Sequence, residues 1–143
     1  PGLRLGVLAS GNTELIANLK KDVSIWNINS FAEFYMQIEE KYKKDYAAAL
    51  VLIREERVRF QSELSKITGI RVIPSQANYI MVELTNGVTA KALTKIMLLK
   101  YNLFVKDLSG KIDGKQFLRL AVRNTEDNDK LISAFKAELE KNY

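Results

Sequence analysis

Residues 117–123 alternate between apolar and polar positions, which is the pattern of a half-buried β-strand. One face carries Leu118, Leu120 and Val122, and the other carries Phe117, Arg119, Ala121 and Arg123. The two arginines of the second face are separated by about 13 Å, at about 3.3 Å per residue. An arginine at such a position is suited to binding a carboxylate, because its planar guanidinium forms two parallel charge-assisted hydrogen bonds. A solvated strand face is the alternative interpretation.

A long helical pattern precedes this strand. Ser30 and Glu33 have the spacing of a capping box, and no proline or glycine follows before Ile67. A single helix of that length would be about 55 Å long, so we expect a break near residues 43–45, with Asp45 capping a second helix that ends before Gly69. The residues expected on the buried sides are Phe31, Phe34, Tyr35, Ile38 and Tyr42 in the first helix and Leu50, Ile53, Phe60, Leu64 and Ile67 in the second.

The remaining pattern alternates between short strands and helices. The expected elements are strands at 70–73, 78–84 and 103–106, a helix at 89–100 with Ala92, Leu93, Ile96 and Leu99 inward, a polar loop at 107–116, and a helix after Asn124 and Thr125 that buries Leu131, Ile132, Phe135 and Leu139. This order predicts an α+β fold in two layers, with the helices on one side of a mainly antiparallel sheet.

The first thirty residues have a different pattern. Residues 7–10 resemble a strand, Thr13 is a candidate cap for a helix to about Lys20, and residues 22–29 resemble an extended linker. A strand at 7–10 would need partners from an upstream segment, so we expect the chain to be the later part of a longer protein. We therefore expect residues 1–29 to be poorly ordered, or to pair with a second copy of the chain.

Composition removes several classes of chemistry. The 143 residues include no cysteine and no histidine, which excludes thiolate nucleophiles, disulfides and Ser-His-Asp mechanisms, and we predict no metal site. No apolar run is long enough to span a membrane and no signal-peptide pattern is present, so we expect a cytoplasmic protein. The net charge of +5 raises the possibility of nucleic-acid binding, but the basic residues alternate with acidic ones, which is typical of solvated helix faces.

Three motifs occur in order along the chain: Gly-Leu-Arg-Leu-Gly at 2–6, Pro-Ser-Gln-Ala-Asn-Tyr at 74–79, and Phe-Leu-Arg-Leu-Ala-Val at 117–122 followed by Glu-Asp-Asn at 126–128. Together they resemble the carboxy-terminal part of fold-type I pyridoxal-phosphate-dependent aminotransferases of class I/II. The resemblance is strongest to the branch that includes histidinol-phosphate aminotransferases and threonine-phosphate decarboxylases. It implies that residues 1–29 are the end of the large cofactor-binding domain and a linker, and that residues 30–143 are the small C-terminal domain with interdomain helices.

The resemblance also implies roles for single residues. Arg4 would bind the phosphate of pyridoxal 5'-phosphate, and Arg119 would bind the α-carboxylate of the substrate. Trp26 and Asn78 would lie near the substrate, although packing and turn capping are their alternative roles. Arg123 departs from the family, which often has a small residue there; a phosphorylated or otherwise anionic substrate side chain would suit it, and so would solvent exposure.

One family feature has no match in this chain. The Schiff-base lysine of such enzymes would lie upstream of Pro1, so no catalytic residue is assigned here and we expect the fragment to be inactive alone. The expected function is that of an aminotransferase acting on an amino acid, as part of a homodimer that binds neither nucleic acid nor membrane. The alternatives are a decarboxylase of the same fold and a non-catalytic α+β binding domain.

Overall fold

The computed structural model describes residues 3–112 and 114–140 of the chain. Their contacts divide the chain into two compact units, one that ends at Ala47 and one that begins at Ala48. This division falls within the long helix α2, Ser30–Leu64. The boundary at residues 29 and 30 that the family resemblance implies stays a prediction. No helix among the described residues is long and apolar enough to cross a membrane.

The first unit contains helix α1, Thr13–Asp22, and the beginning of α2. The strand expected at residues 7–10 is absent, and Val7 is 91% exposed. A strand needs a hydrogen-bonding partner, and no described segment pairs with these residues. The cap of α1 is also one residue earlier than predicted, because the Oδ1 atom of Asn12, not Thr13, accepts a hydrogen bond from the Leu15 amide at 2.9 Å.

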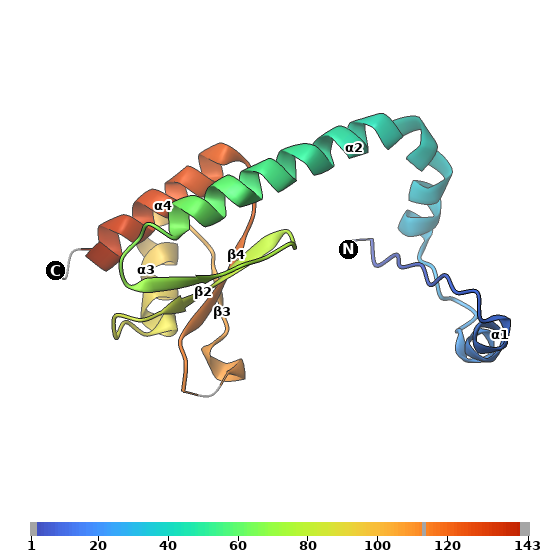
Figure 1. The fold of residues 1–143 in the computed structure, drawn as a ribbon, viewed down its shortest axis with the longest axis horizontal. Helices are drawn as coiled ribbons and strands as arrows, with labels where there is room; N and C mark the ends of the chain where they lie inside the picture. The colour runs from blue at the N-terminus through green and yellow to red at the C-terminus, as the bar shows by residue number, and fades with distance from the viewer. Residues whose placement is uncertain (1–2, 113, 141–143) are drawn as a thin grey trace. The chain divides into compact units, whose positions relative to one another are not determined.

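Helix α2 runs without interruption from Ser30 to Leu64 (Figure 1), so the predicted break at residues 43–45 and the cap at Asp45 are wrong. The segment contains neither proline nor glycine, and Lys43 forms an ion pair with Glu40 one turn earlier at 3.2 Å, which is compatible with a continuous helix. The predicted capping box is wrong too. The Oδ1 atom of Asn29, and not Ser30, accepts from the Ala32 amide at 3.0 Å.

The predicted buried side of the first half of α2 is not observed. Phe31 is 79% exposed and Phe34 is 59% exposed, whereas Ala32 is buried. The second half of the helix behaves as expected, since Phe60 and Leu64 are fully buried and Ile53 packs against the same core. The helix ends at Leu64, and Gly69 instead forms a turn with φ +85° before the first strand.

The second unit contains a four-stranded sheet that consists of β1 (Ile70–Ile73), β2 (Tyr79–Leu84), β3 (Lys106–Asp107) and β4 (Phe117–Ala121). The strand order is β1-β2-β4-β3, and every neighbouring pair is antiparallel, which confirms the predicted sheet. Strand β3 starts three residues later than expected, because Leu103 is engaged in the turn that caps the preceding helix: its amide donates to the Met97 carbonyl at 2.9 Å.

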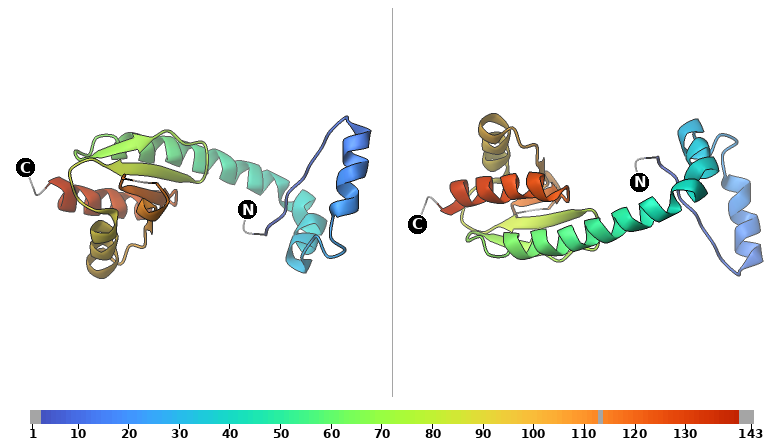
Figure 2. Two further views of the ribbon diagram at one scale, coloured as in Figure 1. Left: turned by 90° about the horizontal axis from the view of Figure 1, so that it is seen from below. Right: turned by 90° about the horizontal axis from the view of Figure 1, so that it is seen from above.

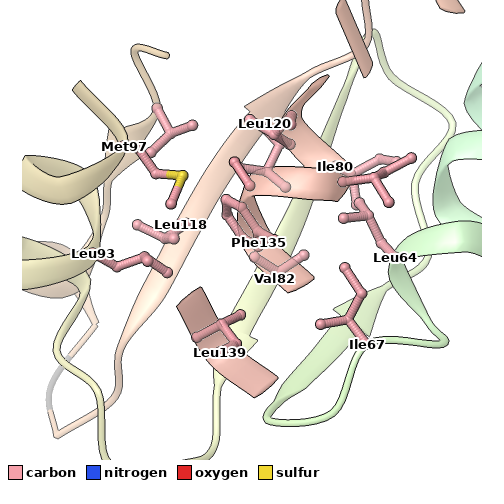
Figure 3. Packing of buried hydrophobic residues seen from close by; sticks show 14 of the residues in the cluster. Leu64, Ile67, Ile80, Val82, Leu93, Met97, Leu118, Leu120, Phe135 and Leu139 are labelled. Carbon is pink, nitrogen blue, oxygen red and sulfur yellow. The ribbon is translucent and has the colours of Figure 1, made fainter. Parts of the chain in front are cut away.

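Helices α3 (Ala90–Tyr101) and α4 (Thr125–Leu139) pack, with the end of α2, on one face of this sheet (Figures 1 and 2). Figure 3 shows ten labelled members of the resulting core: Leu64, Ile67, Ile80, Val82, Leu93, Met97, Leu118, Leu120, Phe135 and Leu139. The buried face of α4 is as predicted. The buried face of α3 differs from the prediction, because it uses Ala90, Leu93 and Met97, and leaves Ile96 and Leu99 36% and 71% exposed. The fold is thus a two-layer α+β domain.

Candidate functional site

The sheet face that points away from the helices carries the candidate site. Side chains alternate along each strand, so the residues opposite each other in the register share a face. Met81 of β2 and Lys106 of β3 both lie directly opposite Arg119 of β4. Arg119 and Lys106 are exposed, as is Ala121 two residues further along β4. We call Met81, Arg119 and Lys106, with Tyr79 and Ala121 beside them, the Arg119 row.

Tyr79 is the direct side-chain neighbour of the arginine in this row. It pairs with Ala121 in the register, and its ring centroid lies 5.3 Å from the Cζ atom of Arg119. This distance is within the range of a cation–π interaction. The small side chain of Ala121 leaves space on β4 beside the ring. No acidic group among the described residues forms an ion pair with Arg119 or Lys106, so the two cations of this row have no ion-pair partner there.

In a second row on the same face, the cations do have a carboxylate partner. Glu83 of β2 lies opposite Arg71 of β1 and accepts a hydrogen bond from its Nε atom at 2.7 Å. Lys115 is 3.7 Å from the other carboxylate oxygen. The hydrogen bond from Arg71 is the main reason that the pKa of Glu83 is lowered from its ordinary value. We call Arg71, Glu83 and Lys115 the Glu83 row.

Arg123 lies outside both rows, two residues beyond the end of β4. Its Nε atom donates to Asp127 at 2.7 Å, and this pair spans one turn at the start of α4. Asn78 is exposed, and its carbonyl accepts from the Val122 amide at 2.9 Å, which extends the β2–β4 ladder by one residue pair. Arg123 therefore has a carboxylate partner, whereas Arg119 has none among the described residues.

A groove of about 740 Å³ lies beside Arg123, between α2 and the start of α4. One of its lining residues, Glu56, accepts hydrogen bonds from Arg59, Thr125 and Asn128 at 2.7–2.9 Å. These bonds, that from Arg59 above all, lower the pKa of Glu56 to about 2. This carboxylate is saturated with partners from α2 and α4, which indicates a structural role in joining the two helices.

Arg4 and Trp26 belong to the unit that ends at Ala47. Arg4 is exposed, and its φ of 58° is in the left-handed region. Trp26 is 91% exposed. The roles of Arg4, Trp26, Asn78, Arg119 and Arg123 all stay predictions, but the structure adds Lys106 and Tyr79 to the surroundings of Arg119.

Sequence reasoning missed Lys106 as a site residue. A strand was expected to end at this lysine, and its residue type is appropriate for an anion. Its position opposite Arg119 depends on the register across the loop at residues 108–116, and a loop of that length does not fix the register.

Comparison with known proteins gives the family. The model of the family "Aminotransferase class I and II" matches residues 1–135. The chain therefore belongs to this family, whose members are pyridoxal-phosphate-dependent enzymes of fold type I, and its α+β fold matches the small C-terminal domain of such enzymes.

Characterised relatives differ in their reactions. The chain is 29% identical to the L-serine phosphate decarboxylase of Sulfurospirillum multivorans over 96% of this chain and 36% of that protein. It is 32% identical to the histidinol-phosphate aminotransferase of Thermoanaerobacter sp. over 94% of this chain and 37% of that protein. The chain thus spans little more than a third of the length of these relatives.

The chain also resembles solved structures of related enzymes. The L-threonine-O-3-phosphate decarboxylase of Porphyromonas gingivalis matches with a TM-score of 0.79 at 25% identity, over 99% of this chain and 43% of that one. The histidinol-phosphate aminotransferase of Clostridium acetobutylicum matches with a TM-score of 0.76 at 31% identity, over 94% of this chain and 40% of that one.

The cofactor of the full-length enzyme is pyridoxal 5'-phosphate, as in the family. The chemistry of Arg4 fits the phosphate group of this cofactor. Its guanidinium is exposed and forms no hydrogen bond or ion pair with any other described residue, so its donors are available.

Proposed function

We propose that this chain is the carboxy-terminal part of an aminotransferase whose amino-acid substrate carries a phosphate or another anionic side group. The observation that supports this function best is the Arg119 row, where two cations lie opposite each other without a carboxylate partner among the described residues. Like charges in that position disfavour the folded chain, and a bound anion would remove the repulsion.

In this proposal Arg119 binds the α-carboxylate. Its guanidinium offers parallel N–H donors that match the two carboxylate oxygens, which fixes the orientation of the substrate as well as its position. Lys106 binds a second anionic group. An ammonium is a point charge with three donors, so it suits a phosphate oxygen without requiring a particular plane.

Arg4 binds the cofactor phosphate. The cofactor, when bound, withdraws electrons from the substrate carbon next to the amino group. The residues of this chain then hold the substrate so that one bond at that carbon is aligned for cleavage.

Decarboxylation is the second candidate reaction. It is favoured by the relatives that are named L-serine phosphate decarboxylase and threonine-phosphate decarboxylase. Both names specify a phosphorylated amino acid, as the proposed second anion site requires. The two reactions differ in the bond that is broken, and Arg119 could orient the carboxylate for either.

The test is an assay of the complete enzyme with O-phosphoserine and O-phosphothreonine, each compared with its unphosphorylated parent. Formation of a keto acid in the presence of an acceptor would support transamination, and release of CO₂ would support decarboxylation. Equal kcat/KM for the phosphorylated and parent amino acids would contradict the proposed second anion site.

Two variants distinguish the candidate residues for the second anion. Lys106→Met should raise KM for the phosphorylated substrate by about tenfold and leave KM for the parent unchanged, which corresponds to about 1.4 kcal/mol. Arg123→Met should have the smaller effect, because Arg123 is already paired with Asp127. The reverse order of effects would assign the second anion to Arg123, as the sequence suggested.

A further inference from the structure

We propose that Tyr79 is a positioning residue that holds the guanidinium of Arg119 in place for the carboxylate. This inference rests on the proposed function of Arg119. Its first support is the geometry: the Cζ atom of Arg119 lies 5.3 Å from the centroid of the Tyr79 ring, and the two residues are diagonal neighbours on one face of β2 and β4.

An aromatic partner has an advantage over an acidic one here. A carboxylate that held Arg119 would occupy its N–H donors, as Glu83 occupies those of Arg71. The face of a ring attracts the cation without accepting an N–H hydrogen bond. Tyr79 therefore restricts the motion of a long, exposed side chain while its donors stay available to a ligand.

The backbone of Tyr79 is itself fixed, on both sides of the residue. Its carbonyl accepts from the Ser75 hydroxyl at 2.6 Å, and the same hydroxyl oxygen accepts from the Ala77 amide at 3.1 Å. The adjacent Asn78 carbonyl bonds to β4 through the Val122 amide. The backbone position from which the Tyr79 ring extends is therefore fixed.

Helix α2 holds the same turn from the other side. Arg57 donates to the Gln76 carbonyl at 2.7 Å, and the Gln61 side chain accepts from the Ser75 amide at 3.2 Å. The Pro-Ser-Gln-Ala-Asn-Tyr motif at residues 74–79 therefore has a structural role in this chain. It forms the hydrogen-bonded turn that places the Tyr79 ring beside Arg119.

The kinetic test uses the complete enzyme. Tyr79→Leu should raise KM for the amino acid about threefold to tenfold, with kcat within twofold, and Tyr79→Phe should restore KM because it keeps the ring. In an Arg119→Met background, which has no cation for the ring to hold, the effect of Tyr79→Leu on KM should disappear. Tyr42→Leu is the matched control, because Tyr42 of the first unit has a similar cation contact, 5.4 Å from Lys41.

An unchanged KM for Tyr79→Leu, an unrestored KM for Tyr79→Phe, or an equal rise in both backgrounds would overturn the inference. If Arg119→Lys alone leaves kcat/KM unchanged, the proposed function of Arg119 has failed instead.

A second measurement needs no activity. In the 143-residue chain, ¹⁵N relaxation of the Arg119 Nε–Hε group should show a restricted side chain in the native sequence and in Tyr79→Phe, and a mobile one in Tyr79→Leu. Equal mobility in all three proteins would overturn the inference even if Tyr79→Leu folds poorly enough to prevent kinetics.

Discussion

The two rows on the outer face of the sheet use similar cations in opposite ways. In the Glu83 row, Arg71 and Lys115 share one carboxylate, which neutralises one of the two positive charges within the chain. In the Arg119 row, Arg119 and Lys106 lie opposite each other, and the groups beside them are a tyrosine ring, a methionine and an alanine. Both rows are on the same face of the sheet, and they differ in the side chains that surround the cations.

This contrast shows how a ligand-binding arginine can be distinguished from a solvated one. Exposure alone does not separate a solvated arginine from a ligand-binding one, since Arg71 and Arg119 are both exposed. The partner does separate them. An arginine that has a carboxylate partner has used its donors, whereas an arginine held by an aromatic ring keeps them.

The largest expected effect comes from replacing the guanidinium of Arg119 in the Arg119 row. Arg119→Lys keeps the charge but loses the parallel donors, so kcat/KM of the complete enzyme for its amino acid should fall by about 2–4 kcal/mol of transition-state binding. Arg71→Lys, the same change in the Glu83 row, should leave kcat/KM within twofold. An unchanged kcat/KM for Arg119→Lys would remove Arg119 from the site.

Sequence reasoning located Arg119 because the alternation along residues 117–123 can be read without knowing any partner strand. The same is true of α4, whose buried residues Leu131, Ile132, Phe135 and Leu139 were all predicted. Local periodicity carries this information. The register between strands depends on tertiary packing, so the positions of Lys106 and Tyr79 relative to Arg119 could not be predicted.

The errors elsewhere have related causes. The predicted break in α2 depends on helix length alone, whereas the segment contains neither proline nor glycine to break the helix. The predicted caps, Thr13 and Ser30, each lie one residue after the observed caps, Asn12 and Asn29. Boundaries of this kind depend on which of two adjacent polar side chains reaches the amide, and both residue types are good caps.

A smaller effect on stability and affinity is expected when a carboxylate is introduced into the Arg119 row. Lys106→Glu places a carboxylate opposite Arg119, which should stabilise the isolated chain by a few tenths of a kcal/mol in urea unfolding. The same variant should raise KM for the anionic substrate in the complete enzyme, because the new carboxylate competes for the guanidinium. A gain in stability with a loss of affinity is the result expected if the row is kept unpaired for a ligand.

Lys111→Glu is the control for this variant, because it makes the same change of charge in the short 3₁₀ helix at Ser109–Lys111, outside both rows. If Lys111→Glu raises KM as much as Lys106→Glu does, the effect comes from the net charge of the domain, and the position opposite Arg119 has no special importance.

The smallest effect is expected in the Glu83 row, and it depends on pH. The pKa of Glu83 is lowered, mainly by the hydrogen bond from Arg71, so this carboxylate favours the folded state when it is charged. Its contribution is fully present above the ordinary pKa of 4.5 and is lost as the pH falls through the lower pKa of the folded chain. Glu83→Gln should therefore slightly lower the urea midpoint of the 143-residue chain at pH 7, and the difference from the native sequence should disappear in acid. Glu55→Gln, the same change at an exposed position of α2, is the control for the loss of one carboxylate. A difference that persists unchanged in acid would mean that Glu83 acts through packing, and the two rows would then not differ in the neutralisation of their charges.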